Sequence, residues 1–171
     1  MSLESVREHF KQWDKENDIM VFESSSATVQ EAAETIGVAP AQIAKTLSFR
    51  GKDDHAILVV TAGDAKIDNK KFRETFTFKA RMLSPDEVLE QTGHPVGGVC
   101  PFGLKNDLDV FLDVSLKRFE KVYPACGSTN SAIELTLDEL EQFSSAKAWV
   151  DVCKGWEEEP AKVEGASGAK A

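Results

Sequence analysis

The chain of 171 residues has 42% hydrophobic and 29% charged residues, which are ordinary proportions for a globular protein with a core of its own. Its formal net charge of −9 argues against a dedicated nucleic-acid-binding protein, because phosphate contacts require Lys and Arg. No apolar run reaches the ~20 residues of a membrane span, and segment 1–18 is too polar for a signal peptide, so we expect a cytoplasmic protein.

The first part of the chain alternates helix and strand signals. Apolar residues at helical spacing predict an amphipathic helix that ends near Asn17. The β-branched and apolar residues of 19–24 favour a strand. A capping box at Thr28 opens a helix that Gly37 ends.

A second short helix is predicted to begin at Pro40 and to pass into a strand over 46–50. Lys45 would then lie at a junction between helix and strand. The apolar segment 55–61 is typical of a central strand, and a helix is expected over 70–76.

Segment 76–83 predicts a further strand, and Ser84 supplies the cap of a helix that Gly93 ends. The run 93–103 contains four glycines and two prolines, so it must be a shaped loop. Strand character returns over 109–116.

The last part of the chain predicts a short polar helix over 116–123, a glycine turn, a strand over 132–137 and a helix capped by Thr136. Segment 157–171 lacks apolar periodicity and is expected to be a disordered tail. We therefore predict one domain over 1–156, with a mixed α/β (α+β) fold of six or seven strands and peripheral helices.

The residues alone offer few signs of chemistry. The common nucleophile, metal and nucleotide motifs are absent. The three cysteines, Cys100, Cys126 and Cys153, are odd in number and are not spaced as zinc ligands are. We therefore expect reduced thiols and no metal or organic cofactor. Lys45 stands among apolar and small residues, so its ammonium either snorkels to the surface or faces a cleft where it can meet a carbonyl or phosphate oxygen. Loop 97–103 is either a tight connection or a cradle whose N–H groups approach a ligand oxygen.

One stretch of this acidic chain is basic. Between Asp64 and Arg81 positive charges outnumber negative ones, which indicates either an ordinary solvated surface or a local basic face. The basic residues are Lys66, Lys70, Lys71, Arg73, Lys79 and Arg81.

Three features stand in order along the chain: QIAKTLSF (42–49), GGVCPFG (97–103) and ACGSTNSAIELTLDEL (125–140). Segments 57–72 and 80–98 support them. Together they resemble the YbaK/EbsC family of trans-editing domains associated with prolyl-tRNA synthetase. The resemblance implies a mixed, barrel-like sheet with surrounding helices. It also implies deacylation of tRNA that carries a small wrong amino acid, such as alanine or cysteine on proline tRNA.

The resemblance also implies roles for individual residues. Lys45, Gly97 and Gly98 would be catalytic, with the lysine contacting the carbonyl or the terminal phosphate and sugar. The residues implied to bind substrate are Thr46, Val99, Cys100, Pro101, Phe102, Gly103, Gly127, Ser128 and Asn130. The tRNA acceptor end is the implied partner, with Lys66, Lys70, Lys71 and Arg73 as its contacts.

The GSTN turn at 127–130 is less basic than that of the cysteine-specific members, so their substrate preference does not transfer. Whether a synthetase supplies tRNA specificity stays open. The alternative to an enzyme is a non-catalytic module that binds a nucleotide or aminoacyl-tRNA in the same cleft. A third interpretation makes Lys45 and the glycine loop ordinary architecture.

Overall fold

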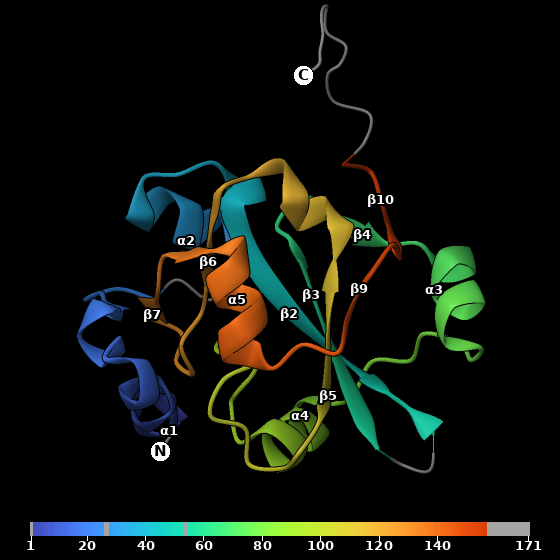
Figure 1. Cartoon of the computed structure of the whole chain (residues 1–171), viewed down its shortest axis with the longest axis horizontal. Coiled ribbons are helices and arrows are strands. Elements are labelled where there is room, and N and C mark those ends of the chain that lie inside the picture. The colour runs from blue at the N-terminus through green and yellow to red at the C-terminus, as the bar shows by residue number, and fades with distance from the viewer. Residues whose placement is uncertain (1, 26–27, 53–54, 157–171) are drawn as a thin grey trace, which may run out of the picture.

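A curled six-stranded mixed sheet forms the centre of the molecule in the computed structural model, which describes residues 2–25, 28–52 and 55–156 (Figure 1). The strand order is β8-β6-β2-β3-β5-β9. The strands are β2 (Ile43–Arg50), β3 (Ala56–Ala62), β5 (Asp109–Asp113), β6 (Lys121–Pro124), β8 (Leu135–Thr136) and β9 (Ala148–Val150). The expected tail over 157–171 lies outside the described residues.

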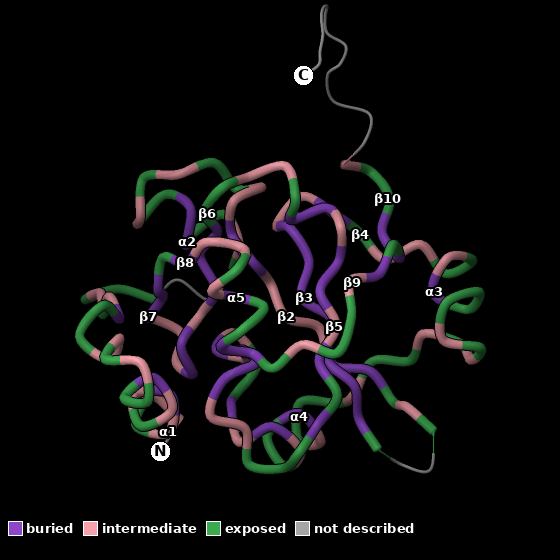
Figure 2. The backbone as a smooth tube through the Cα atoms, in the orientation of Figure 1, coloured by how far each residue is buried: buried purple, intermediate pink, exposed green. Residues whose placement is uncertain are grey.

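The hairpin of β2 and β3 is the longest pairing of the sheet, and it runs in antiparallel register from Ala44↔Ala62 to Arg50↔Ala56. β5 pairs with β3 in parallel, and β9 pairs with β5 in parallel. Every residue of β3 is buried, as expected for a strand that is covered on both faces (Figure 2).

Five α-helices of the described chain surround this sheet (Figure 1). The predicted caps are confirmed, because Thr28, Ser84 and Thr136 each accept a hydrogen bond from the backbone N–H three residues later. The helices are α1 (Ser2–Phe10), α2 (Val29–Ile36), α3 (Asn69–Phe76), α4 (Pro85–Thr92) and α5 (Leu137–Ser144). None of the described helices is long and apolar enough to cross a membrane.

Short elements complete the fold. Two small antiparallel ribbons pair β1 (Met20–Val21) with β7 (Ser131–Ala132), and β4 (Lys66–Ile67) with β10 (Cys153–Lys154). The 3-10 helices are η1 (Lys11–Trp13), η2 (Glu16–Asp18), η3 (Pro40–Gln42) and η5 (Val114–Arg118). The mixed α/β class expected from the sequence is confirmed.

The predicted position of Lys45 at a helix-to-strand junction is wrong. The helix after Pro40 is a single 3-10 turn, and β2 already begins at Ile43. Ile43 and Ala44 pair with β6, so tertiary pairing draws these residues into the sheet. Lys45 is therefore the third residue of β2.

Two other predicted elements are also wrong. Segment 76–83 is not a strand, because α3 continues to Phe76, Thr77 ends it in the left-handed conformation, and only an isolated bridge joins Met82 to Phe49. Segment 116–123 is not a helix, because its 3-10 turn gives way to β6, which pairs with β2 and β8. In 116–123 long-range pairing overrides the local pattern, whereas in 76–83 the end of α3 and its left-handed cap at Thr77 replace the start of the expected strand.

Candidate active site

A pocket of about 430 Å³ lies at the edge of β2 that faces away from β3. On this edge β6 pairs with β2 only at Ile43 and Ala44. The chain after α3 returns to the same edge at Ser48, whose carbonyl accepts a hydrogen bond of 3.1 Å from the Leu83 N–H. Between these two attachments, over 45–47, no described strand pairs with this edge of β2.

Side chains from both faces of β2 line the pocket: Thr46 and Ser48 on one face, Lys45 and Leu47 on the other. A cavity can touch both faces of one strand only where the strand edge is open. Because the Ser48 carbonyl points to this edge, alternation along the strand directs the peptide groups of Thr46 to it as well. The pocket is thus a notch in the sheet with free main-chain groups on one wall.

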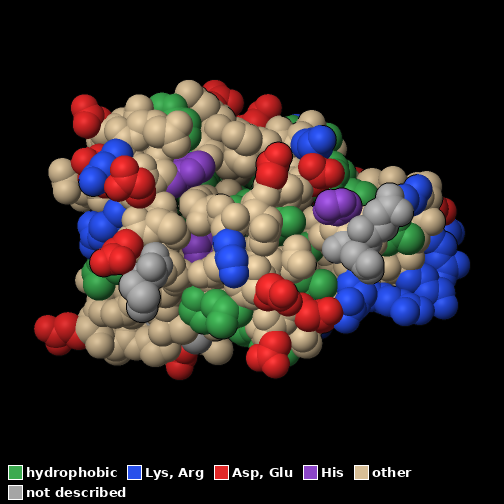
Figure 3. Space-filling view, turned by 90° about the horizontal axis from the view of Figure 1, so that it is seen from below, with side chains coloured by type: hydrophobic (Ala, Val, Ile, Leu, Met, Phe, Trp, Pro, Cys, Tyr) green, Lys and Arg blue, Asp and Glu red, His purple; other side chains and the backbone are tan. Residues whose placement is uncertain are grey.

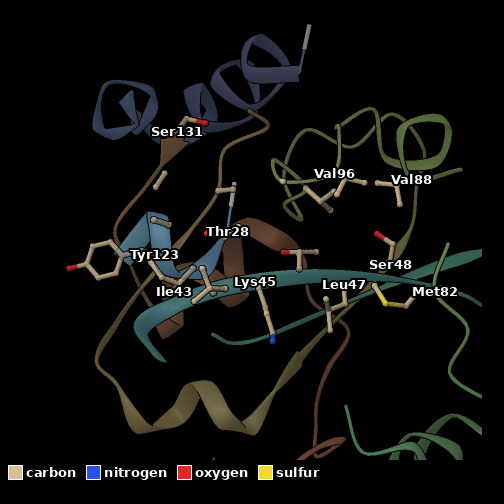
Figure 4. Close-up of a pocket in the computed structure, with 18 of the residues that line it drawn as sticks. Thr28, Ile43, Lys45, Leu47, Ser48, Met82, Val88, Val96, Tyr123 and Ser131 are labelled. Atoms are coloured by element: carbon tan, nitrogen blue, oxygen red, sulfur yellow. The ribbon is translucent and has the colours of Figure 1, made fainter. Parts of the chain in front are cut away.

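The remaining walls are mostly small or apolar (Figure 4). They come from α2, from the segment 82–88, from the glycine loop and from the turn beyond β6. Besides the residues of β2 and the glycine loop, this lining comprises Thr28, Val29, Ala32, Met82, Leu83, Pro85, Val88, Val96, Tyr123, Ala125, Ser131 and Ala132. Such a lining suits a small ligand that is held by a few polar contacts.

Lys45 is the cation of this pocket. Its side chain is partly buried, and it makes no ion pair or hydrogen bond with another described residue. Burial lowers the pKa of Lys45 below its ordinary value of 10.5, against the weaker opposite influence of Cys153 and Asp64. A partly desolvated ammonium without a carboxylate partner is poised to bind an oxygen of a ligand.

The direction of the Lys45 side chain is visible in Figure 4. The ammonium leaves β2 on the side opposite to Val96, whereas the hydroxyl of Ser48 lies on the side of Val96. Lys45 and Gly97 therefore line one pocket, but the ammonium does not point at the loop. A ligand that contacts both must wrap around the open edge of β2.

Gly97 and Val99 line the pocket, whereas Gly98 between them in the chain does not. The Gly98 carbonyl accepts a hydrogen bond of 3.0 Å from the N–H of Gly127. A Cβ atom at Gly98 would lie 2.7 Å from the nitrogen of Ser128, closer than real Cβ contacts. The absence of a side chain at Gly98 lets the two glycine loops pack backbone against backbone.

Several residues expected to bind substrate are not on the pocket surface. Cys100 and Phe102 are fully buried in the core, and burial raises the pKa of the Cys100 thiol to about 12, so this thiol is protonated at neutral pH. Pro101 and Gly103 line a separate polar depression beside His9.

Gly127, Ser128 and Asn130 stand one layer behind the pocket wall. The hydroxyl of Ser128 shares a hydrogen bond of 2.7 Å with Ser131, which does line the pocket. The side-chain amide of Asn130 donates to the carbonyl of Phe22 at 2.8 Å. These three residues shape the wall from behind.

Sequence reasoning missed several pocket residues. Tyr123 was placed in a helix that does not form, and in the structure it lies on β6 with its hydroxyl donating to Glu134 at 2.7 Å. That hydrogen bond is the main reason why the pKa of Tyr123 rises to about 12. Val88 is a buried apolar residue of α4, and an apolar residue on a helix gives no sign of a ligand site in the sequence. Ser131 lies within the glycine-turn motif over 125–140, and this position was the signal that could have placed it among the substrate-binding residues.

The four residues expected to contact tRNA do not line the pocket; they lie on β4 and α3. Lys66, Lys70 and Arg73 are exposed. Lys71 is partly buried, and its ammonium contacts Asp151 at 3.2 Å and the carbonyl of Cys153 at 3.1 Å. Figure 3 shows Lys and Arg side chains gathered at the end of the molecule where α3 lies.

The structure is that of an α/β protein with a small, mostly apolar pocket at an edge of its central sheet. The model of the family described as "Aminoacyl-tRNA editing domain" matches residues 23–143. The chain belongs to this family.

Relatives and solved structures agree with this assignment. The chain is 71% identical over 157 residues to the "Uncharacterized protein YwhH" of Bacillus subtilis, covering 92% of this chain and 100% of that protein. It is 26% identical to the "Putative Cys-tRNA(Pro)/Cys-tRNA(Cys) deacylase EbsC" of Enterococcus faecalis, covering 70% of this chain and 74% of that one. A structure described as a "putative trans-editing enzyme for prolyl tRNA synthetase" superposes with a TM-score of 0.81 at 28% identity, covering 90% of this chain and 98% of that one.

The chain also matches proline–tRNA ligases. That of Thermosipho melanesiensis is 26% identical over 146 residues, which cover 85% of this chain. The chain spans only 13% to 25% of the length of such ligases. The match thus concerns one part of those proteins.

Proposed function

We propose that the protein is a trans-acting aminoacyl-tRNA deacylase, which hydrolyses the ester between tRNA and a small misattached amino acid of the alanine or cysteine type. Membership of the editing family and the printed names of the relatives support this activity. The observation that carries the proposal is the notch, where the peptide groups of Thr46, the Gly97 backbone and the ammonium-bearing Lys45 border one small volume.

The notch fits the proposed substrate in size and in polarity. Its volume of about 430 Å³ exceeds what a small amino acid needs, so the terminal ribose can enter with the aminoacyl group. Met82 and Val96 are 59% and 57% exposed and stand at its walls, where they offer an apolar surface to the terminal base. Thr46 Oγ1 is buried without a hydrogen-bond partner among the described residues, so a ligand can supply one.

The chemistry needs positioning more than a protein nucleophile. A water molecule or the neighbouring ribose hydroxyl attacks the ester carbonyl, and loop amides near Gly97 stabilise the negative charge on the carbonyl oxygen. The bond from the carbonyl carbon to the ribose oxygen then breaks, and that oxygen takes up the proton that the attacking water or hydroxyl releases. With water as the final nucleophile the products are the free amino acid and intact tRNA.

Lys45 has a separate part in this proposal. Its ammonium points to the other side of the β2 edge, so it contacts the phosphate and sugar of the terminal nucleotide while the loop holds the carbonyl. The exposed charges of Lys66, Lys70 and Arg73 meet the acceptor end further out. Met82, which follows Arg81 of this basic segment in the chain, lines the pocket.

A deacylation panel tests the proposed function. Proline tRNA charged with alanine, with cysteine and with proline is incubated with the protein, and release of the amino acid is followed over time. We expect multiple turnovers on alanyl or cysteinyl tRNA and slow release from prolyl tRNA. Binding without turnover on every substrate would support the alternative of a non-catalytic binding module.

A further inference from the structure

Helix α1 packs against both glycine loops through its own backbone. A Cβ atom at Gly103 would lie 2.6 Å from the carbonyl oxygen of Ser5, and one at Gly127 would lie 2.7 Å from that of Ser2. Both glycines also have positive φ, at 59° and 94°. Each loop is therefore in direct contact with the first turns of α1.

A buried histidine joins the same helix to the loop that carries Gly97. His94 is fully buried, and its two ring nitrogens have different partners: Nδ1 lies 2.6 Å from the hydroxyl of Ser2, and Nε2 lies 2.7 Å from the carbonyl of Phe102. A carbonyl can only accept, so Nε2 carries the proton and Nδ1 accepts the proton of Ser2. Burial lowers the pKa of His94, which keeps this neutral form at physiological pH.

The two loops are in turn bonded to each other. The N–H of Gly127 donates to the carbonyl of Gly98 at 3.0 Å, and Gly97 beside it lines the pocket. A path of contacts thus runs from Ser2 through His94 to one loop, and from Ser2 directly to the other. Helix α1 lies outside residues 23–143, the part of the chain that the family model matches.

We propose that Ser2 and His94 are positioning residues, and that the hydrogen bond between them makes α1 a brace that holds the two glycine loops in the arrangement that forms the pocket. That α1 holds the two loops in place is a structural proposal, which stands by itself. That this brace supports catalysis rests on the proposed deacylase function, because it requires loop amides at the ester carbonyl. Neither residue lines the pocket, so both act through the loop backbone.

The substitution Ser2→Ala tests the brace, because it removes one hydroxyl and leaves the helix in place. Two controls accompany it. Glu8→Ala changes an exposed side chain of the same helix whose partner is Lys11. Phe72→Leu weakens the core around α3, where Phe72 packs against Phe76 and Phe78.

Amide hydrogen exchange and deacylation kinetics are measured on all four proteins. In Ser2→Ala we expect faster exchange over 97–103 and 126–130 but not over 69–76, and a fall in kcat of about fivefold with little change in KM, as for one lost hydrogen bond. Phe72→Leu should show the reverse exchange pattern, and Glu8→Ala should match the wild type. The variant His94→Gln should reproduce the pattern of Ser2→Ala.

If amide exchange over 97–103 and 126–130 were unchanged in Ser2→Ala, the proposal that α1 braces the two loops would be overturned. Ser2→Ala and Phe72→Leu are also compared at equal loss of stability. If kcat then fell equally in both variants, general destabilisation would explain the loss of activity, and the positioning role would be overturned. If the wild type released no amino acid from any substrate, the proposed function would fail. Exchange alone would then support or overturn the structural part.

Discussion

Replacing Lys45 with methionine should separate activity from stability. The ammonium makes no ion pair or hydrogen bond with a described residue, so the folded protein loses no partner when the charge is removed. Methionine retains an unbranched apolar stem of similar length, which preserves packing beside Leu47. The desolvation cost of the charge disappears, so we expect unfolding free energy to stay equal or to rise by up to about 1 kcal/mol, a shift of about 2–4 °C in Tm.

The size of this stability effect depends on pH. Because the pKa of Lys45 in the folded protein is below the ordinary value of 10.5, the unfolded chain holds the proton more tightly. The folded wild type therefore carries a penalty at neutral pH, which fades as pH rises through the folded pKa towards 10.5. The advantage of Lys45→Met should be present at pH 7 and should shrink in alkaline buffer.

Activity should respond in the opposite direction. If the ammonium stabilises charge at the terminal nucleotide in the transition state, its removal should lower kcat by about 10²–10³-fold. Deacylation of mischarged proline tRNA and thermal unfolding are measured on the same preparations, with Lys11→Met as a control at an exposed lysine of η1. A kcat for Lys45→Met close to that of the wild type would refute the assigned role. A large fall in Tm would instead show that the lysine stem is structural.

The remaining predictions concern the loops, the basic segment and the buried histidine. Gly98→Ala should destabilise the protein by about 1–3 kcal/mol and lower deacylation, since its Cβ overlaps the backbone of Ser128; an unchanged Tm would contradict this. Replacing both Lys70 and Arg73 with Gln should weaken tRNA binding and reduce its dependence on salt, while hydrolysis of an aminoacyl-adenosine ester continues unchanged. Because burial lowers the pKa of His94, the unfolded chain takes up a proton before the folded protein does as pH falls below 6.5. Stability should therefore decline as pH falls below 6.5, and His94→Gln should flatten that decline in urea titrations.

The sequence by itself determined where three of the helices begin and which family the chain belongs to. Capping boxes at Thr28, Ser84 and Thr136 involve residues three positions apart, so local chemistry settles where these helices begin. The collinear motifs over 42–49, 97–103 and 125–140 were enough to recognise the editing family, which the family match confirms.

Only the tertiary structure decided where the site lies. The notch exists because β6 leaves β2 after Ala44 and another segment rejoins it at Ser48, and such pairing depends on residues far apart in the sequence. The same long-range pairing turned the expected helix around Tyr123 into a strand. The direction of Lys45, and the burial of His94 against α1, follow from how strands and loops pack in space, which no spacing along the chain encodes.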